Sequence, residues 1–367
     1  MNSPGRIDAL GGRLHLRPGL GRPHNLHSDR QDWAARLAPG RHAADWPALL
    51  GRLLSLCGQS QQLCARLALQ AARGLQGQTD DADRLRQETL REHLRRILLD
   101  WPRLLGPDAA LTAQAQQALN RCPGLGPAPA HPALLDWLAE DLLQEPVRLW
   151  LQHWQADPAG WLRDWSGQGR SWLAALLDRT RPLLDQARPA CPPLPFPQAE
   201  ADWLALAGPL ASDPGFSVRP LWHGGCAETG PWSRQRQPHP EAFDTPWLRL
   251  GARLAELLRL ALPDQAPDCG RHWLRQAGFS PRPGEGLGAV EMARGLLVHR
   301  VRLDDSGERL VEAQVLAPTE WNFHPLGPVA LALENPPAAS GVRPYAQALV
   351  CAYDPCVPHE IDEVTHA

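Results

Sequence analysis

The chain has 367 residues, a formal net charge of −3 and no polybasic run. Apolar residues make up 43 % and charged residues 21 %, which provides for a sizeable core and an ordinary charge content. Nucleic-acid binding is therefore not indicated, because that function leaves a basic footprint in the sequence. The length predicts one large domain or two intimately packed ones, and we expect one domain over 1–367 with a Pro-rich connector at 188–198.

The N-terminal residues 1–12 show neither an apolar stretch after basic residues nor a twin-arginine motif, and no window approaches eighteen uninterrupted apolar residues. We therefore expect no secretory signal, no membrane span and a cytoplasmic location. In that reducing compartment the 8 cysteines are expected to be thiols. Their scattered spacing supports neither a disulfide framework nor a zinc ribbon.

Helical patterns dominate the first 261 residues, after a short strand expected at 13–16. The longest apolar periodicity predicts one helix over 47–75, with Pro47 at an N-terminal position. Cys57 and Cys64 would lie seven residues apart on one face of it. The other predicted helices cover residues 32–37, 83–101, 108–120, 132–155, 171–187 and 246–261.

A long loop is expected at 212–245, which carries His223, Cys226 and His239. These three residue types could bind a metal, but the surrounding sequence predicts no ordered framework that would bring them together. Further on, Gly284, Gly286 and Gly288 are interpreted as a glycine-rich loop, but not as a nucleotide site, since no strand precedes them.

The pattern changes in the last third of the chain. Segments 295–303 and 310–317 are rich in Val and Leu, and Asp-Asp-Ser-Gly separates them at 304–307. This arrangement predicts a β-hairpin. The sequence thus predicts a mainly α protein with a small β element near its C-terminal end.

Three motifs, in the same order along the chain, resemble signatures of nickel–iron hydrogenase large subunits. Residues 52–57 (Arg-Leu-Leu-Ser-Leu-Cys) resemble the family's Arg-x-Cys-Gly-x-Cys motif. The glycine-rich segment 284–299 with its Arg-Gly pair, followed by Pro-Thr-Glu-Trp-Asn at 318–322, resembles a second signature. Residues 354–356 (Asp-Pro-Cys) resemble the start of the C-terminal Asp-Pro-Cys-x-x-Cys motif. The resemblance implies a helical bundle like that of the large subunit, with a β-hairpin near the C-terminus.

The departures from these motifs concern the nickel side of the family's metal centre. There, four thiolates hold nickel and an iron that carries cyanide and carbonyl ligands. Here Cys57 stands at a position whose thiolate bridges nickel and iron in the family, and Cys356 at a position whose thiolate binds nickel alone. The second nickel-only position is Leu54, and the second bridging position is His359. Two thiolates cannot supply the sulfur-rich coordination that soft metals prefer, and Leu54 cannot ligate at all. Gln61 replaces the His that follows the family's first motif. We expect no hydrogen turnover and no nickel, although His359 remains a candidate ligand.

The iron side of the centre is better preserved. Arg294, Pro318 and Thr319 match the positions that line the cyanide ligands in the family. A guanidinium offers permanent charge-assisted donors to an anionic cyanide, and a Thr hydroxyl adds one directional bond. The candidate metal ligands are thus Cys57, Cys356 and His359, beside three candidate cyanide-binding residues.

The resemblance implies a non-catalytic accessory protein of hydrogenase maturation, of the HupK/HoxV type. Such a scaffold would transiently hold the iron–cyanide–carbonyl fragment and pass it to the catalytic large subunit. The expected partners are a small maturation chaperone, the large subunit and upstream maturation factors. The alternative is a metal-free mimic of the large subunit that binds or regulates maturation factors, and a third interpretation is an altered active metalloenzyme. Without the resemblance, Cys57 would be interpreted as a buried structural cysteine. For His359 the alternative is a solvent-facing histidine in the C-terminal segment.

Overall fold

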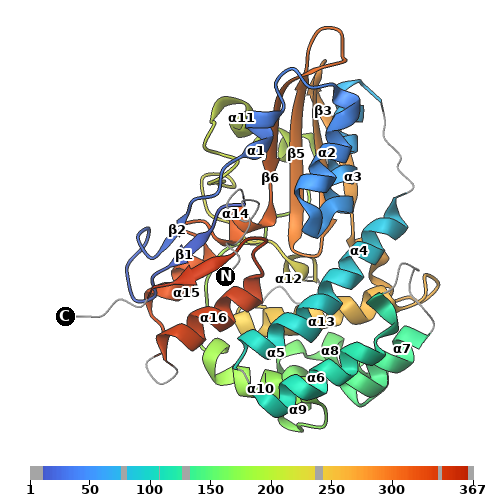
Figure 1. Ribbon diagram of the computed structural model, residues 1–367, viewed down its shortest axis with the longest axis vertical. Coiled ribbons are helices and arrows are strands. Elements are labelled where there is room, and N and C mark those ends of the chain that lie inside the picture. The colour runs from blue at the N-terminus through green and yellow to red at the C-terminus, as the bar shows by residue number, and fades with distance from the viewer. Residues whose placement is uncertain are drawn as a thin grey trace, which may run out of the picture.

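A four-stranded sheet stands on a layer of helices in the computed structural model, which describes residues 11–75, 81–106, 108–125, 133–235, 243–337 and 341–362. Figure 1 shows the sheet upright, with two N-terminal helices against one face and the helical layer beneath. The sheet comprises β3 (Gln276–Arg282), β4 (Glu285–Met292), β5 (Gly295–Leu303) and β6 (Leu310–Leu316) in antiparallel order.

The helical layer is built around α13 (Pro246–Ala261), in which every residue is buried. Three polar residues of α13, Arg249, Arg253 and Glu256, fall on one face at helical spacing and point into the interior rather than to solvent. The surrounding helices are α4 (Ala82–Arg95), α5 (Trp101–Leu104), α6 (Ala109–Arg121), α7 (Ala133–Trp137), α8 (Val147–Ala156), α9 (Pro158–Gly167) and α10 (Trp172–Leu184).

The two ends of the chain meet in a second, three-stranded sheet. Here β1 (Leu14–Leu16) lies between β2 (Leu26–Ser28) and β7 (His359–Ile361). This pairing brings the segment after β2 beside the segment before β7, although more than 300 residues separate them. The remaining helices are α1 (Trp33–Leu37), α11 (Glu200–Ser212), α12 (Pro231–Gln235), α14 (Pro318–Asn322), α15 (Pro328–Glu334) and α16 (Val342–Tyr353).

The single helix predicted over 47–75 is wrong, because the chain bends in its middle. It forms α2 (Trp46–Leu53), a 3₁₀ turn at Ser55–Cys57 and α3 (Gly58–Ala72). The break lies at Leu54, whose φ of −110° and ψ of 54° are not helical. A Cβ on Gly58 would lie 2.7 Å from the carbonyl oxygen of Gly51, so only glycine allows this close turn.

The predicted glycine-rich loop is also wrong, because Gly286 and Gly288 lie in β4. Along this strand, alternate residues face opposite sides of the sheet. A Cβ on Gly286 would lie 2.1 Å from the carbonyl oxygen of Ala68, and one on Gly288 would lie 2.2 Å from that of Cys64. The two glycines therefore let α3 pack directly on the backbone of β4, while Leu287 faces the opposite core cluster with α11.

Most of the other predicted elements occur with altered boundaries. The predictions at 13–16, 32–37, 108–120, 171–187 and 246–261 are confirmed by β1, α1, α6, α10 and α13. The predicted segment 83–101 is continuous but π-helical at Arg96–Asp100. The predicted helix at 132–155 is interrupted in its described part. Gln144, in the left-handed conformation, ends the first helical segment, and Pro146 precedes α8, which begins at Val147.

The Pro-rich segment 188–198 contains neither helix nor named strand, as its composition requires. Its Leu194 and Phe196 are buried in the cluster beneath α11, and Pro193 pairs with Glu228 in an isolated parallel bridge. The predicted loop at 212–245 contains the short helix α12 among its described residues. Of the helices that the structure describes, none has the length and apolar character needed to cross a membrane.

The packing of α3 on β4 predicts opposite outcomes for two glycine-to-alanine substitutions. Gly288→Ala should lower the free energy of unfolding by about 2 kcal/mol or more, because the added methyl group overlaps helix backbone. Gly208→Ala in α11, where a Cβ would meet nothing within 4 Å, should leave stability unchanged or raise it by about 0.5–1 kcal/mol. Urea unfolding of both variants checks this, and equal stability of the two would contradict the assigned contact.

Candidate thiol site

Two thiols from distant parts of the chain lie beside one buried arginine. Cys57 is at the junction between the 3₁₀ turn and α3, and Cys356 follows α16 by three residues. Arg294 occupies the two-residue turn between β4 and β5, where Met292 pairs with Gly295. Arg294 and Cys356 both affect the pKa of Cys57, and the two thiols both affect the pKa of Arg294, so the three groups lie close together. The site therefore forms where the sheet meets the helical layer.

Cys356 receives two hydrogen bonds on its sulfur. The Thr319 hydroxyl and the Arg30 Nη1 each lie 3.2 Å from Sγ, and the backbone N–H of Cys356 donates to Thr319 Oγ1 over 3.2 Å. Arg30 is in turn held by Glu320, whose Oε1 lies 2.6 Å from its Nε. Pro318 begins α14 and so fixes the turn that aims Thr319 at the sulfur.

Cys57 is only 7 % exposed and is contacted by a polar relay from the sheet. Gln61 Nε2 donates to its sulfur over 3.6 Å, and Gln61 Oε1 accepts from His299 Nε2 over 2.8 Å. Burial raises the pKa of the Cys57 thiol to about 12, although the guanidinium of Arg294 acts in the opposite direction. Burial also lowers the pKa of His299 to about 3, so this imidazole is neutral near pH 7.

Arg294 is buried and retains hydrogen-bonding capacity toward the site. Its Nη2 donates to Glu92 Oε2 over 2.8 Å, and its Nε lies 3.5 Å from Asp354 Oδ2. Its Nη1 has no hydrogen-bond partner among the described residues. Burial alone would lower the pKa of Arg294, but Asp354, Glu92 and the two thiols raise it above its usual value. A permanently charged group thus keeps a donor for which the described residues supply no acceptor.

Asp354 anchors the segment that carries Cys356. It ends α16 in the left-handed conformation, with φ of 52°, and its carboxylate is buried. Arg96 ion-pairs with its Oδ1, and Arg253 Nη2 lies 3.0 Å from its Oδ2, beside the contact with Arg294. Burial would raise its pKa, but the three guanidinium groups lower it to about 2. The motif aspartate therefore stays ionised and connects the π-helical segment after α4, α13, the β4–β5 turn and α16.

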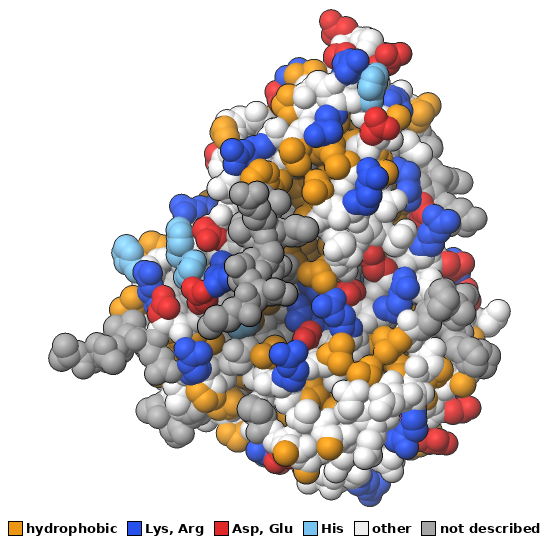
Figure 2. Space-filling model, in the orientation of Figure 1, with side chains coloured by type: hydrophobic (Ala, Val, Ile, Leu, Met, Phe, Trp, Pro, Cys, Tyr) orange, Lys and Arg blue, Asp and Glu red, His pale blue; other side chains and the backbone are white. Residues whose placement is uncertain are grey.

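A second buried ion network continues from Arg253. Its Nη1 donates over 3.0 Å to His93 Nδ1, and His93 Nε2 donates over 2.8 Å to Glu256 Oε2. Arg234 bonds Glu256 Oε2 at 2.6 Å and Glu291 Oε2 at 2.7 Å. On the face shown in Figure 2, basic and acidic side chains gather along the seam between the sheet and the helical layer.

The structure brings together five of the six residues singled out from the sequence: Cys57, Cys356, Arg294, Pro318 and Thr319. His359 lies apart from them among the described contacts. Gln347 Nε2 lies 3.1 Å from His359 Nε2, within hydrogen-bond distance. Both residues line a shallow groove at β7 together with Arg343 and Asp362. Burial lowers the pKa of His359. Its role as a ligand stays a prediction.

Sequence reasoning missed the residues that surround the thiols. Arg30 lies between the strand predicted at 13–16 and the helix predicted at 32–37, and no periodicity pointed to it. The one available signal was Glu320, an acid at the variable position of the Pro-Thr-x-Trp-Asn motif, which implies a basic partner when buried. His299 lies in the segment 295–303 that was predicted as a strand, and its partner is Gln61.

The other cysteines make ordinary contacts. Cys64 lies on α3 and donates to the Gly288 carbonyl over 3.2 Å, so it belongs to the core. Cys351 lies on α16, where it is buried. Cys226 lies 3.2 Å from His324 Nδ1, whereas His239 lies outside the described residues. Within the described ranges, no group of three or more His, Cys, Asp or Glu residues could hold a metal ion.

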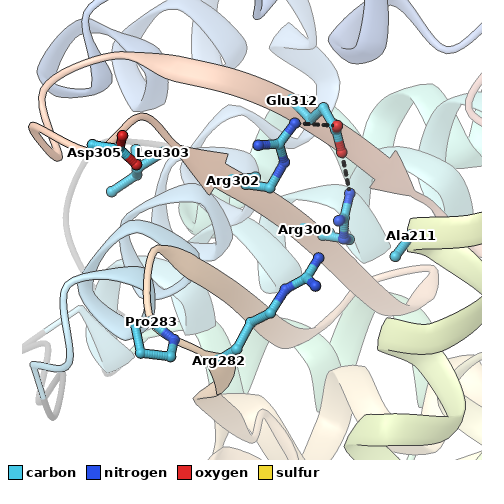
Figure 3. A pocket seen from close by; sticks show the side chains of 8 residues that line it. All are labelled: Ala211, Arg282, Pro283, Arg300, Arg302, Leu303, Asp305 and Glu312. Carbon is cyan, nitrogen blue, oxygen red and sulfur yellow. Dashed lines mark hydrogen bonds and ion pairs between the residues drawn. The ribbon is translucent and has the colours of Figure 1, made fainter.

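A separate cavity of about 430 Å³ opens on the sheet face near the end of α11 (Figure 3). Arg300 extends from β5 between two carboxylates, with Glu285 Oε1 at 2.6 Å and Glu312 Oε2 at 2.9 Å. The cavity is lined by Ala211, Arg282, Pro283, Arg300, Arg302, Leu303, Asp305 and Glu312. Its three arginines are matched by neighbouring acids, so this cavity presents no unbalanced charge to a ligand.

The fold belongs to a known class, that of nickel–iron hydrogenase large subunits. The structure aligns with the nickel–iron–selenium hydrogenase of Desulfovibrio vulgaris Hildenborough with a TM-score of 0.54. The alignment covers 90 % of this chain and 92 % of that one at 16 % sequence identity, so it shows the fold alone.

Within this class, the sequence identifies a narrower family. The chain is 40 % identical, over 97 % of both chains, to the hydrogenase expression/formation protein HoxV of Cupriavidus necator. It is 33 % identical, over 90 % of this chain and 91 % of the relative, to the hydrogenase expression/formation protein HupK of Bradyrhizobium diazoefficiens. No protein-family model matches. The chain belongs to the HoxV/HupK family of hydrogenase expression/formation proteins.

The buried network around Glu256 predicts a specific pH dependence of stability. Burial would raise the pKa of Glu256, but Arg234 and His93 lower it to about 2. Its contribution is therefore complete above the unfolded pKa of about 4.3 and is lost as the pH falls toward 2. Glu256→Gln should lower the free energy of unfolding at pH 7 by about 3 kcal/mol and should flatten the decline between pH 4.5 and 2.

Asp178→Asn is the matched control, since Asp178 pairs with Arg181 at 3.5 Å with both side chains more than one-third exposed. It should change stability by no more than about 0.5 kcal/mol. Urea unfolding at several pH values measures both variants. An unchanged acid profile for Glu256→Gln would show that the network does not carry this charge.

Proposed function

We propose that this protein is a non-catalytic scaffold of hydrogenase maturation that transiently holds an iron group with cyanide and carbonyl ligands. In this proposal Cys57 and Cys356 bind the iron as thiolates, and Arg294 with Thr319 binds the cyanides. The group is then passed to the catalytic large subunit. The iron group is thus a cargo rather than a resident cofactor.

One observation carries the proposal: the buried guanidinium of Arg294 has a nitrogen without an acceptor and is close enough to Cys57 and Cys356 for both thiols to affect its pKa. An unpaired buried donor costs free energy, so Arg294 Nη1 is expected to meet an acceptor when the protein acts. The cyanide nitrogen of an iron group is an anionic acceptor of the right kind. Arg294 also favours the thiolate form of Cys57, which burial otherwise disfavours.

The number of protein ligands also supports such a cargo. The described residues place two thiols at the site and no third metal-binding side chain with them. Two thiolates leave a bare transition-metal ion short of its usual coordination. An iron that already carries three diatomic ligands needs fewer ligands from the protein, so two thiols suit it better.

The names of the relatives support the biological setting. HoxV and HupK are hydrogenase expression/formation proteins, and this chain matches them over nearly its whole length. The fold of a hydrogenase large subunit would let the scaffold meet maturation factors that also recognise that subunit. We propose a small maturation chaperone and the large subunit itself as its partners, and a cytoplasmic location for the exchange.

Infrared spectroscopy on protein purified without oxygen from a host with the maturation genes tests the proposal. Carbonyl and cyanide stretches should appear, with iron and little nickel by elemental analysis. Cys57→Ser and Cys356→Ser should lose the bands and should mature hydrogenase at least about tenfold less well. Arg294→Gln should shift the cyanide bands, because it removes the charge that binds them.

Cys122→Ser is the control, because Cys122 lies at the end of α6 in the helical layer, away from the site. It should keep both the bands and the maturation activity. Protein that matures hydrogenase normally but contains neither iron nor bands would replace the proposal with a metal-free mimic of the large subunit. Hydrogen-dependent dye reduction by the pure protein would instead indicate an enzyme.

A further inference from the structure

Arg30 makes a direct contact with a thiol that the sequence motifs did not anticipate. Its Nη1 lies 3.2 Å from Cys356 Sγ, and its Nε lies 2.6 Å from Glu320 Oε1. The side chains of Arg30 and Glu320 are 16 % and 7 % exposed. The backbone N–H of Arg30 donates to Ser28 Oγ over 3.3 Å, at the end of β2. The guanidinium is therefore held in place from both its backbone and its head group.

This contact places a fixed positive charge where a metal bound to Cys356 would have to approach. Thr319 and Arg30 already occupy two directions around the sulfur. A divalent ion at a metal–sulfur distance of about 2.3 Å would lie close to the guanidinium and be repelled by it. Moving Arg30 away would leave Glu320 as an uncompensated buried carboxylate, which is strongly unfavourable.

We propose that Arg30 is a specificity-determining residue that excludes bare divalent ions, nickel among them, from Cys356. An iron group with cyanide ligands differs from a bare ion, because its outer atoms are anionic acceptors that a guanidinium attracts. The same residue thus repels a free metal ion and admits the cargo. This inference rests on the proposed function for the cargo, whereas the exclusion of bare ions can be tested without any cargo.

The test is an anaerobic titration of the full, reduced, cargo-free protein with Co²⁺, followed by the thiolate–cobalt charge-transfer absorption. The parent protein should show no such band. Arg30→Gln, which keeps donors but removes the charge, should bind Co²⁺ at least about tenfold more tightly and should show the band. Arg30→Lys should behave like the parent. The double variant of Arg30→Gln with Cys356→Ser should lose the band.

Arg66→Gln is the matched control, because Arg66, on α3 about two and a half helical turns beyond Cys57, forms a comparable part-buried pair with Asp81. It should bind Co²⁺ no better than the parent. A thiolate–cobalt band in the parent protein overturns the inference whether or not any variant folds. A folded Arg30→Gln variant that gains no affinity, or gains it independently of Cys356, overturns it too.

The two proposals fail separately. Infrared bands from cargo together with tight Co²⁺ binding by the cargo-free parent would refute only the role of Arg30. Exclusion of Co²⁺ by Arg30 in a protein that never carries cyanide or carbonyl bands would refute only the assigned cargo.

Discussion

The arrangement of the thiol site depends on one buried carboxylate. Asp354 binds Arg96, Arg253 and Arg294, which come from three separate elements, while its own backbone ends α16. Because a buried carboxylate is tolerated only with such partners, each arginine is tied to the position of the aspartate. Cys356 lies two residues further on, so its sulfur is placed by the same constraint. The position of one thiol is thus fixed by electrostatics rather than by apolar packing.

The other thiol is placed by close packing. The glycines at 286 and 288 let α3 lie against the backbone of β4, and the same strand leads into the turn that carries Arg294. Cys57 begins α3, so the distance between this thiol and the guanidinium is set by a helix and a strand in direct contact. Rigid elements hold functional groups more accurately than loops do. The guanidinium donors of Arg294 and Arg30 near the sulfurs suit an anionic guest.

Motif spacing predicted which residues would lie near one another, whereas the fold around them was predicted in part. Motif spacing gave Cys57, Cys356, Arg294 and Thr319, which the structure gathers around one point, and strong periodicity gave α13. The buried strand β4 was missed because both its faces are covered, so it shows no alternation, and because glycine is uncommon in strands. Arg30 was missed because its contact crosses 326 residues of sequence and depends on the pairing of both chain ends in one small sheet.

Leu54 affects the direction in which the iron group of the proposed function would be transferred. Leu54 is 36 % exposed and stands where the resembling enzymes offer a further thiolate. In the proposed function, a hydrocarbon there would leave the iron group with two sulfur attachments from the described residues, Cys57 and Cys356. A recipient site with four thiolates would hold the same guest more tightly, and it could begin to bind before the donor lets go. Ligand count alone would then drive the handover, with no nucleotide hydrolysis and no free iron in solution.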